Sequence, residues 1–169
     1  MFIYYNERAM EGSIPYDNGA YIRDGIKSIN KVGVCPETLW PYDISTFTEK
    51  PSDDCYTAAI KNTAEEYARV PQTLEDIKAC LAEGFPFVFG FTVLSSFFSD
   101  EVSTTGKMKM PQEDDYILGG HAVQACGYND EDQVIIVRNS WGEGWGDKGY
   151  FYMPYDYICD PFLASDMWA

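Results

Sequence analysis

The residues best suited to chemistry are His121, the only histidine in the chain, and Asn139. An imidazole held by an amide oxygen acts as an oriented base, and such pairs occur in enzymes that activate a nucleophile. Taken singly, a histidine in an apolar stretch is more often a packed core residue, and an Asn-Ser pair before glycines is more often a turn. Their occurrence together favours a catalytic pair.

Two neighbouring strands would have to position this pair. His121 opens an apolar stretch just after Gly120, which leaves open space beside the imidazole, and Asn139 closes a second apolar stretch. The polar run 129–132 between them predicts a hairpin that brings the two side chains alongside each other. Trp141 follows at once and is expected to cover the pair from water.

Helical patterns occupy the first part of the chain and strand patterns the second, which indicates an α+β fold with segregated lobes. Helices are expected over 2–11, from a cap at Asp17 or Asn18 to about 31 with a stop at Gly33, over 53–62, and from the Thr73 cap to Gly84. Strands are expected over 87–93, 121–128, 133–139 and 149–153.

Composition excludes several classes of protein. Hydrophobic residues make up 46% of the 169 residues, so a core can form and disorder is not expected. With 27 acidic and 12 basic residues the net charge is −15, which argues against nucleic acid or an anionic membrane as a partner. No signal peptide is visible, and no apolar run reaches the roughly 18 residues of a membrane-spanning helix.

The five cysteines are widely spaced, without a CxxC pair, and their odd number cannot pair fully within the chain. Mostly reduced thiols in a reducing, intracellular compartment are the simplest interpretation. A bridge between Cys35 and Cys55, around the proline-rich turns, stays open as an alternative. Neither a metal nor another cofactor is expected.

The sequence also resembles a known family. The stretches Gly119-Gly120-His121-Ala122-Val123 and Asn139-Ser140-Trp141-Gly142-Glu143-Gly144-Trp145-Gly146 closely resemble the histidine and asparagine regions of papain-like cysteine proteases (peptidase C1), which use a Cys-His-Asn triad. Upstream, Asp17-Asn18-Gly19-Ala20-Tyr21 and Trp40-Pro41-Tyr42 are similar to the family's substrate-binding glycine region and its Tyr-Pro-Tyr turn. The resemblance covers nearly the whole chain and is strongest over residues 119–151.

The resemblance implies a two-lobed papain-like α+β fold. Residues 1–70 would be the remainder of the helical lobe, incomplete because it lacks the nucleophile helix. Residues 71–169 would form an antiparallel β-barrel-like lobe that carries His121 and Asn139.

The resemblance also implies a role for each matching residue. His121 would be the general base and acid, Asn139 would orient its imidazole, and Trp141 would shield their hydrogen bond. Trp145 is expected to pack in the core. The remaining residues would bind a peptide or protein substrate: Asn18, Gly19 and Ala20 through β-like backbone pairing, and Gly90, Gly120 and Ala122 as small residues beside the histidine.

None of the five cysteines lies in the Gln…Cys-Gly-Ser/Ala-Cys-Trp segment that carries the nucleophile in this family. The resemblance places that segment before Met1, so we expect the natural protein to begin upstream or to need a complementing N-terminal segment. This chain by itself is predicted to be inactive.

Three functions follow as hypotheses. The first is a cysteine-type peptidase that hydrolyses peptide bonds once its nucleophile segment is present. The second is a non-catalytic relative that binds peptides or a partner chain. In the third, Cys55 or another thiol substitutes for the nucleophile, but the spacing gives this little support.

Overall fold

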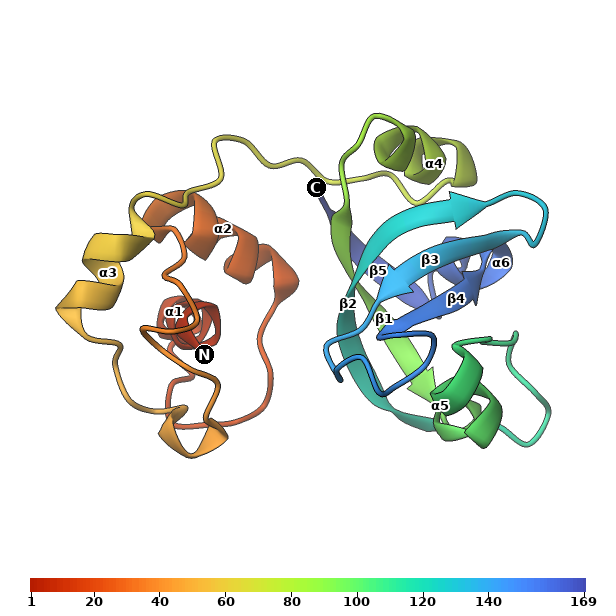
Figure 1. Ribbon diagram of the computed structural model, residues 1–169, viewed down its shortest axis with the longest axis horizontal. Coiled ribbons are helices and arrows are strands. Elements are labelled where there is room, and N and C mark those ends of the chain that lie inside the picture. The colour runs from red at the N-terminus through yellow and green to blue at the C-terminus, as the bar shows by residue number, and fades with distance from the viewer. The chain divides into compact units, whose positions relative to one another are not determined.

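The computed structural model describes all 169 residues, which divide into two compact units, Met1–Tyr67 and Ala68–Ala169 (Figure 1). The first unit is helical and the second contains every strand, so the fold is α+β as the sequence predicts. The helical unit comprises α1 (Phe2–Glu11), α2 (Ile22–Val32), the short 3-10 turn η1 (Ile44–Thr46) and α3 (Asp53–Ala59).

In the helical unit, α1 packs against α2. Gly25 makes this contact close, because a side-chain carbon there would lie 2.5 Å from a carboxylate oxygen of Glu7. The helix α2 ends at Gly33, whose φ of 83° suits only glycine and whose missing side chain makes room for the carbonyl of Ala59. The helix stop expected from the sequence is therefore present.

The N-terminal cap expected for α2 was wrong. The helix begins after Tyr21, which provides no side-chain cap, and not after Asp17 or Asn18. Asp17 instead accepts a hydrogen bond from the Tyr4 hydroxyl, 2.5 Å away. A long-range partner on α1 thus outcompetes the local capping interaction.

The core of the helical unit is small and contains two thiols. Phe2, Cys35, Cys55 and Ala59 form its buried cluster. All five cysteines of the chain are free thiols, so the alternative Cys35–Cys55 bridge is not formed. Burial, reinforced by the neighbouring Cys55 sulfur, raises the pKa of the Cys35 thiol.

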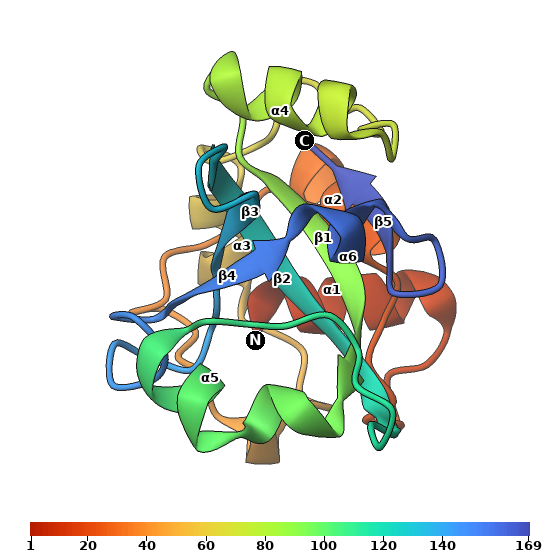
Figure 2. The ribbon, with the colours of Figure 1, turned by 90° about the vertical axis from the view of Figure 1, so that its right-hand side faces the viewer.

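The second unit is built on one five-stranded antiparallel sheet in the order β4-β3-β2-β1-β5 (Figure 2). The strands are β1 (Phe87–Leu94), β2 (Ile117–Asn129), β3 (Val134–Arg138), β4 (Tyr150–Pro154) and β5 (Ala164–Trp168). Along β1, Phe87, Phe89 and Phe91 are buried at every second position, as the pleat of a strand requires. They form the centre of the larger hydrophobic core.

This sheet is antiparallel, as expected, but it is open and does not close into a barrel. Closure would need β4 to pair with β5, and loop segments occupy the outer edge of each of these strands. Tyr152 of β4 exchanges hydrogen bonds with Gly106 and Met108. On the other side, Ala169, directly after β5, exchanges hydrogen bonds with Ala68.

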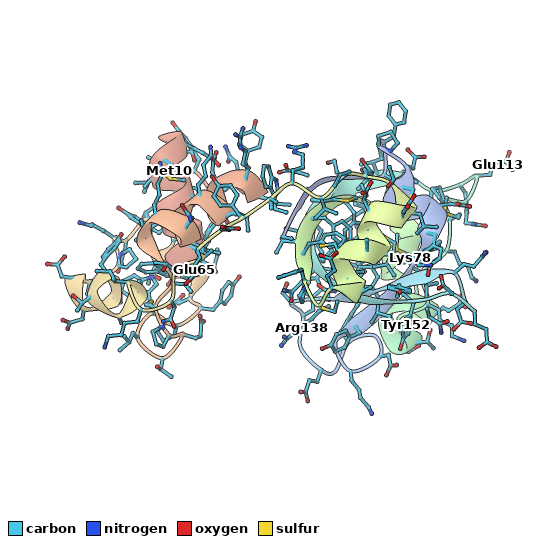
Figure 3. The ribbon with its side chains drawn as sticks, turned by 90° about the horizontal axis from the view of Figure 1, so that it is seen from above. Met10, Glu65, Lys78, Glu113, Arg138 and Tyr152 are labelled. Carbon is cyan, nitrogen blue, oxygen red and sulfur yellow. The ribbon has the colours of Figure 1, made fainter.

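Three helices flank the sheet: α4 (Leu74–Ala82), α5 (Asp100–Thr105) and α6 (Tyr155–Cys159). The first two lie at opposite ends of the sheet in Figure 2. Thr73 caps α4 as the sequence predicts, by accepting from the Asp76 amide at 3.1 Å. Lys78 of α4, labelled in Figure 3, donates to Asp130 in the turn between β2 and β3 at 2.5 Å.

The expected strands 87–93, 121–128, 133–139 and 149–153 correspond to β1 to β4, with shifted ends. Sequence reasoning missed α5, α6 and β5, each of which is only five or six residues long. None of the helices has the length and apolar character that crossing a membrane requires.

Candidate active site

The β2–β3 hairpin brings His121 and Asn139 together. Its antiparallel register pairs Gln124 with Arg138, so Asn139 follows directly along the strand beside β2. His121 Nε2 lies 2.9 Å from Asn139 Oδ1, within hydrogen-bond distance. The hairpin predicted from the polar turn is confirmed.

Neighbouring hydrogen bonds determine which nitrogen of the imidazole is free. The backbone N–H of Ser140 donates to Asn139 Oδ1 at 2.8 Å, which identifies that atom as the carbonyl oxygen. A carbonyl oxygen only accepts, so His121 must donate through Nε2. In the neutral ring Nδ1 is then unprotonated and makes no hydrogen bond. The geometry presents a base at Nδ1.

Aromatic rings surround the imidazole. The Trp141 indole stacks on His121, with centroids 5.1 Å apart and planes inclined by 23°. Phe98 in turn stacks on Trp141, at 5.7 Å and 24°. Phe91, the cross-strand partner of His121, approaches the imidazole to 5.8 Å. These rings restrict the orientation of the imidazole.

Sequence reasoning missed Phe91 and Phe98. The pairing of Phe91 with His121 depends on the β1–β2 register, which no local pattern gives. Phe98 belongs to a 3-10 turn, η2 (Ser95–Phe98), whose four residues are too few to show a periodic pattern. Trp145 packs against Phe97 and Phe151, consistent with the core position expected for it.

The three small residues expected near the histidine lie on neighbouring strands. Gly90 of β1 is the cross-strand partner of Ala122, and Gly120 pairs with Thr92. A side-chain carbon at Gly120 would have only the Phe91 carbonyl near it, at 3.9 Å. These residues leave free space on both sides of His121 along β2.

An open hollow of about 460 Å³ adjoins the His121–Asn139 pair. Its lining includes Ala122, Gln124, Asn139 and Arg138, the last of which is labelled in Figure 3. Asn139 is only 7% exposed, and its buried Nδ2 has no hydrogen-bond partner. The Asn139 amide nitrogen is therefore enclosed by protein and unpaired, while the hollow lies beside the pair.

Asn18, Gly19 and Ala20 belong to the helical unit, in the segment between α1 and α2. Asn18 and Gly19 are exposed and Ala20 is half-buried. The Gly19 amide donates to the Tyr4 hydroxyl at 3.3 Å. Ala20 makes no hydrogen bond through its N–H or its C=O, so both groups are free to pair with a ligand.

The five thiols are divided between the two units. In the helical unit, Cys55 is 1% exposed, and its sulfur lies 3.3 Å from the Ser52 hydroxyl. In the strand-rich unit, burial raises the pKa of the thiols of Cys80, Cys126 and Cys159. Within this unit, none of these three thiols hydrogen-bonds to His121. The structure also contains no group of three or more side chains that could hold a metal ion.

This fold and this histidine–asparagine pair define a class of protein, and comparison with known families identifies it. The chain belongs to the papain family of cysteine proteases, whose family model matches residues 15–161. Its fold is accordingly the papain-like α+β fold.

Sequence comparison with individual proteins supports the same family assignment. The chain is 49% identical over 176 residues to an uncharacterized peptidase C1-like protein of Acanthamoeba polyphaga mimivirus, covering 99% of this chain and 57% of that protein. It is 35% identical over 128 residues to cysteine proteinase 2 of Entamoeba histolytica, covering 72% of this chain and 37% of that protein. The chain thus spans about half the length of the curated relatives it matches, or less.

Among solved structures, xylellain, a cysteine protease from Xylella fastidiosa, superimposes with a TM-score of 0.90 at 48% identity. The match covers 99% of this chain and 67% of that one.

Proposed function

We propose that this chain supplies the base and the substrate-binding part of a cysteine peptidase that hydrolyses peptide bonds by Cys-His-Asn chemistry. The observation that carries the proposal is the His121–Asn139 hydrogen bond, which leaves Nδ1 of the imidazole free to serve a thiol. Membership in the papain family supports the same chemistry.

In this mechanism a cysteine gives its proton to His121, and the resulting thiolate attacks the peptide carbonyl. The imidazolium then protonates the departing amine, leaving an acyl-enzyme thioester. His121 next takes a proton from the water that attacks the thioester, and the thiol is released. Asn139 keeps the ring oriented throughout, and Trp141 protects their hydrogen bond from water.

The substrate would bind as an extended peptide. Ala20 offers an unpaired N–H and C=O for β-like pairing with a peptide backbone, with Asn18 and Gly19 beside it. Gly90, Gly120 and Ala122 would leave room for a substrate side chain near His121. The methyl group of Ala20 would leave less room than a glycine for the peptide backbone to approach this segment.

The nucleophile would come from outside these 169 residues, either from further residues of the natural product or from a complementing segment. This assignment rests on the sequence around the five cysteines, none of which lies in the family's nucleophile segment, and on the strand-rich unit, where no thiol hydrogen-bonds to His121. Residues 1–70 would then be the remainder of the helical lobe and 71–169 the lobe that carries the base. The chain by itself would not cleave peptides.

Labelling with an epoxide or vinyl-sulfone warhead tests this proposal. In the natural product we expect rapid, stoichiometric modification of one cysteine outside residues 1–169, abolished by His121→Ala. The chain alone should not be modified rapidly at any of its five thiols. A folded natural product that is not labelled would rule out the peptidase.

A non-catalytic, peptide-binding protein is the second candidate, and the lack of a hydrogen bond between His121 and any thiol of the strand-rich unit favours it for the chain in isolation. This candidate predicts peptide binding in the natural product without labelling by the warhead. Labelling that depends on His121 would contradict it.

A further inference from the structure

One face of α1 points toward the segment that links α1 to α2. Tyr4, Arg8 and Glu11 are spaced i, i+4 and i+7, so they lie on the same side of the helix. Each of the three hydrogen-bonds to residues beyond the end of α1. This face therefore organises the linking segment, which includes Asn18, Gly19 and Ala20.

Arg8 anchors the start of the segment. It is completely buried, and its guanidinium donates to the carbonyls of Ile14 at 2.6 Å and Tyr16 at 3.3 Å. It also donates to the carbonyl of Phe47, and it lies 4.0 Å from the centre of the Tyr4 ring. A buried charge is tolerated only when it is well paired, and here carbonyls and an aromatic face are its partners.

Tyr4 and Glu11 hold the residues on either side of Ala20. The Tyr4 hydroxyl donates to Asp17 at 2.5 Å and accepts from the Gly19 amide at 3.3 Å. Glu11 accepts from the Tyr21 amide at 2.8 Å. Ala20 between them keeps both backbone groups unpaired.

We propose that Tyr4 and Glu11 are positioning residues for substrate, which hold Gly19 and Tyr21 so that Ala20 alone presents its N–H and C=O to an extended peptide. This inference rests on the proposed function of the segment. The two side chains do not touch the peptide. They accept hydrogen bonds from the amides of Gly19 and Tyr21, which would otherwise be free to move or to pair with the peptide in place of Ala20. Fixing the segment beforehand reduces the entropy lost on binding.

The test begins with amide hydrogen exchange in the full chain, measured residue by residue by NMR. Tyr4→Phe removes the hydroxyl and keeps the ring over Arg8. Tyr5→Phe is the matched control, because the Tyr5 hydroxyl lies on the same helix and makes no hydrogen bond. We expect Gly19 to exchange about three to ten times faster in Tyr4→Phe, with no change in Tyr5→Phe and similar melting temperatures in both.

Peptide binding is then measured with acetyl-Ala-Phe-Ala-amide, through the shift of the Ala20 amide resonance. We expect the Kd for this peptide to rise about three- to tenfold in Tyr4→Phe and to remain unchanged in Tyr5→Phe. A purely structural role for Tyr4 would lower the melting temperature without a selective loss of peptide affinity.

The outcomes separate this inference from the proposed function. Equal Gly19 exchange in the wild type and Tyr4→Phe overturns the positioning role, whatever the peptide does. Equal peptide affinity in the two proteins also overturns it. Faster Gly19 exchange in Tyr4→Phe, with no Ala20 shift in the wild type at millimolar peptide, overturns the substrate-binding assignment itself.

Discussion

Trp141 lies almost flat against His121, at a centroid distance of 5.1 Å, while Asn139 holds the imidazole at Nε2 from 2.9 Å. The hydrogen bond fixes which nitrogen is protonated and the indole fixes the plane of the ring. A hydrogen bond strengthens where water is excluded, so the indole and the amide support each other. The catalytic predictions for the natural product follow from this arrangement.

Removing the Asn139 side chain should impair catalysis more than folding. Asn139→Ala leaves Nε2 without its acceptor and the ring free to rotate. We expect kcat/KM for a peptide substrate to fall by about 100-fold, or about 2.7 kcal/mol. Asn129→Ala is the control in the same hairpin: Asn129 accepts from the Glu131 amide in the turn, so its loss should lower stability and leave kcat/KM unchanged.

Truncating Trp141 should expose the His121–Asn139 hydrogen bond to water. We expect Trp141→Ala to lower kcat by about tenfold, whereas Trp141→Phe, which retains an aromatic face over the imidazole, should lose less. Steady-state kinetics on both variants checks this. Equal activity of Trp141→Ala and the wild type would contradict the shielding role.

Asp115 should make the strand-rich unit sensitive to acid. Its carboxylate accepts from the amides of Gln112 and Ser96, each at 2.8 Å, and from the hydroxyl of Ser95 at 2.9 Å. The Gln112 amide hydrogen bond is the largest cause that lowers the Asp115 pKa from 3.8 to about 2. The folded state therefore holds this proton less tightly than the unfolded state, so stability is present above about pH 4 and is lost as the pH falls toward 2.

Melting temperatures across this pH range test the role of Asp115. Asp115→Asn should lower the melting temperature at pH 7 and flatten its dependence on pH between 4 and 2. Asp114→Asn, at an adjacent carboxylate without a hydrogen bond, should change neither. A pH profile of Asp115→Asn parallel to the wild type would contradict this account.

Glu7 should make the helical unit less stable as the pH rises, which is the opposite of the effect of Asp115. Burial against α2, followed by repulsion from Glu11, raises the pKa of Glu7 from 4.5 to about 7. The folded state binds this proton more tightly than the unfolded state, so the stabilisation is full below about pH 4.5 and is lost as the pH rises through 7. Glu7→Gln should therefore melt at a higher temperature than the wild type at pH 8.

The control for Glu7 is Glu49→Gln, since the Glu49 side chain makes no hydrogen bond or ion pair. It should leave the melting curve unchanged at both pH 5 and pH 8. If Glu7→Gln and the wild type melt alike at pH 8, Glu7 is not the source of the pH dependence.

Thiol accessibility should distinguish the two buried cysteines from the others. Cys35 and Cys55 are 6% and 1% exposed, so a thiol reagent should label them only on unfolding. Mass spectrometry after denaturation should count five free thiols, since no cysteine is bridged. Three labelled thiols after denaturation without reductant would indicate a bridge.

Much of the site could be predicted from local pattern. Two apolar stretches joined by a polar turn predict the hairpin that brings Asn139 close to His121. The same pattern does not predict the shift of its register between Ala125 and Gly127. The cap at Thr73 and the stop at Gly33 also follow from local chemistry. The cap of α2 could not be predicted this way, because Tyr4 competes for Asp17 from a distant position in the chain.

The sequence by itself determined the family, the order of helices and strands, and the hairpin that carries His121 and Asn139, since each depends on residue type and local spacing. Only the tertiary structure decided that Nδ1 is the free nitrogen, that Phe98 extends the aromatic stack, and that Tyr4 holds Gly19. These features depend on contacts between segments that are far apart in the sequence. Strand register and helix packing determine those contacts, and no local stretch of residues contains that information.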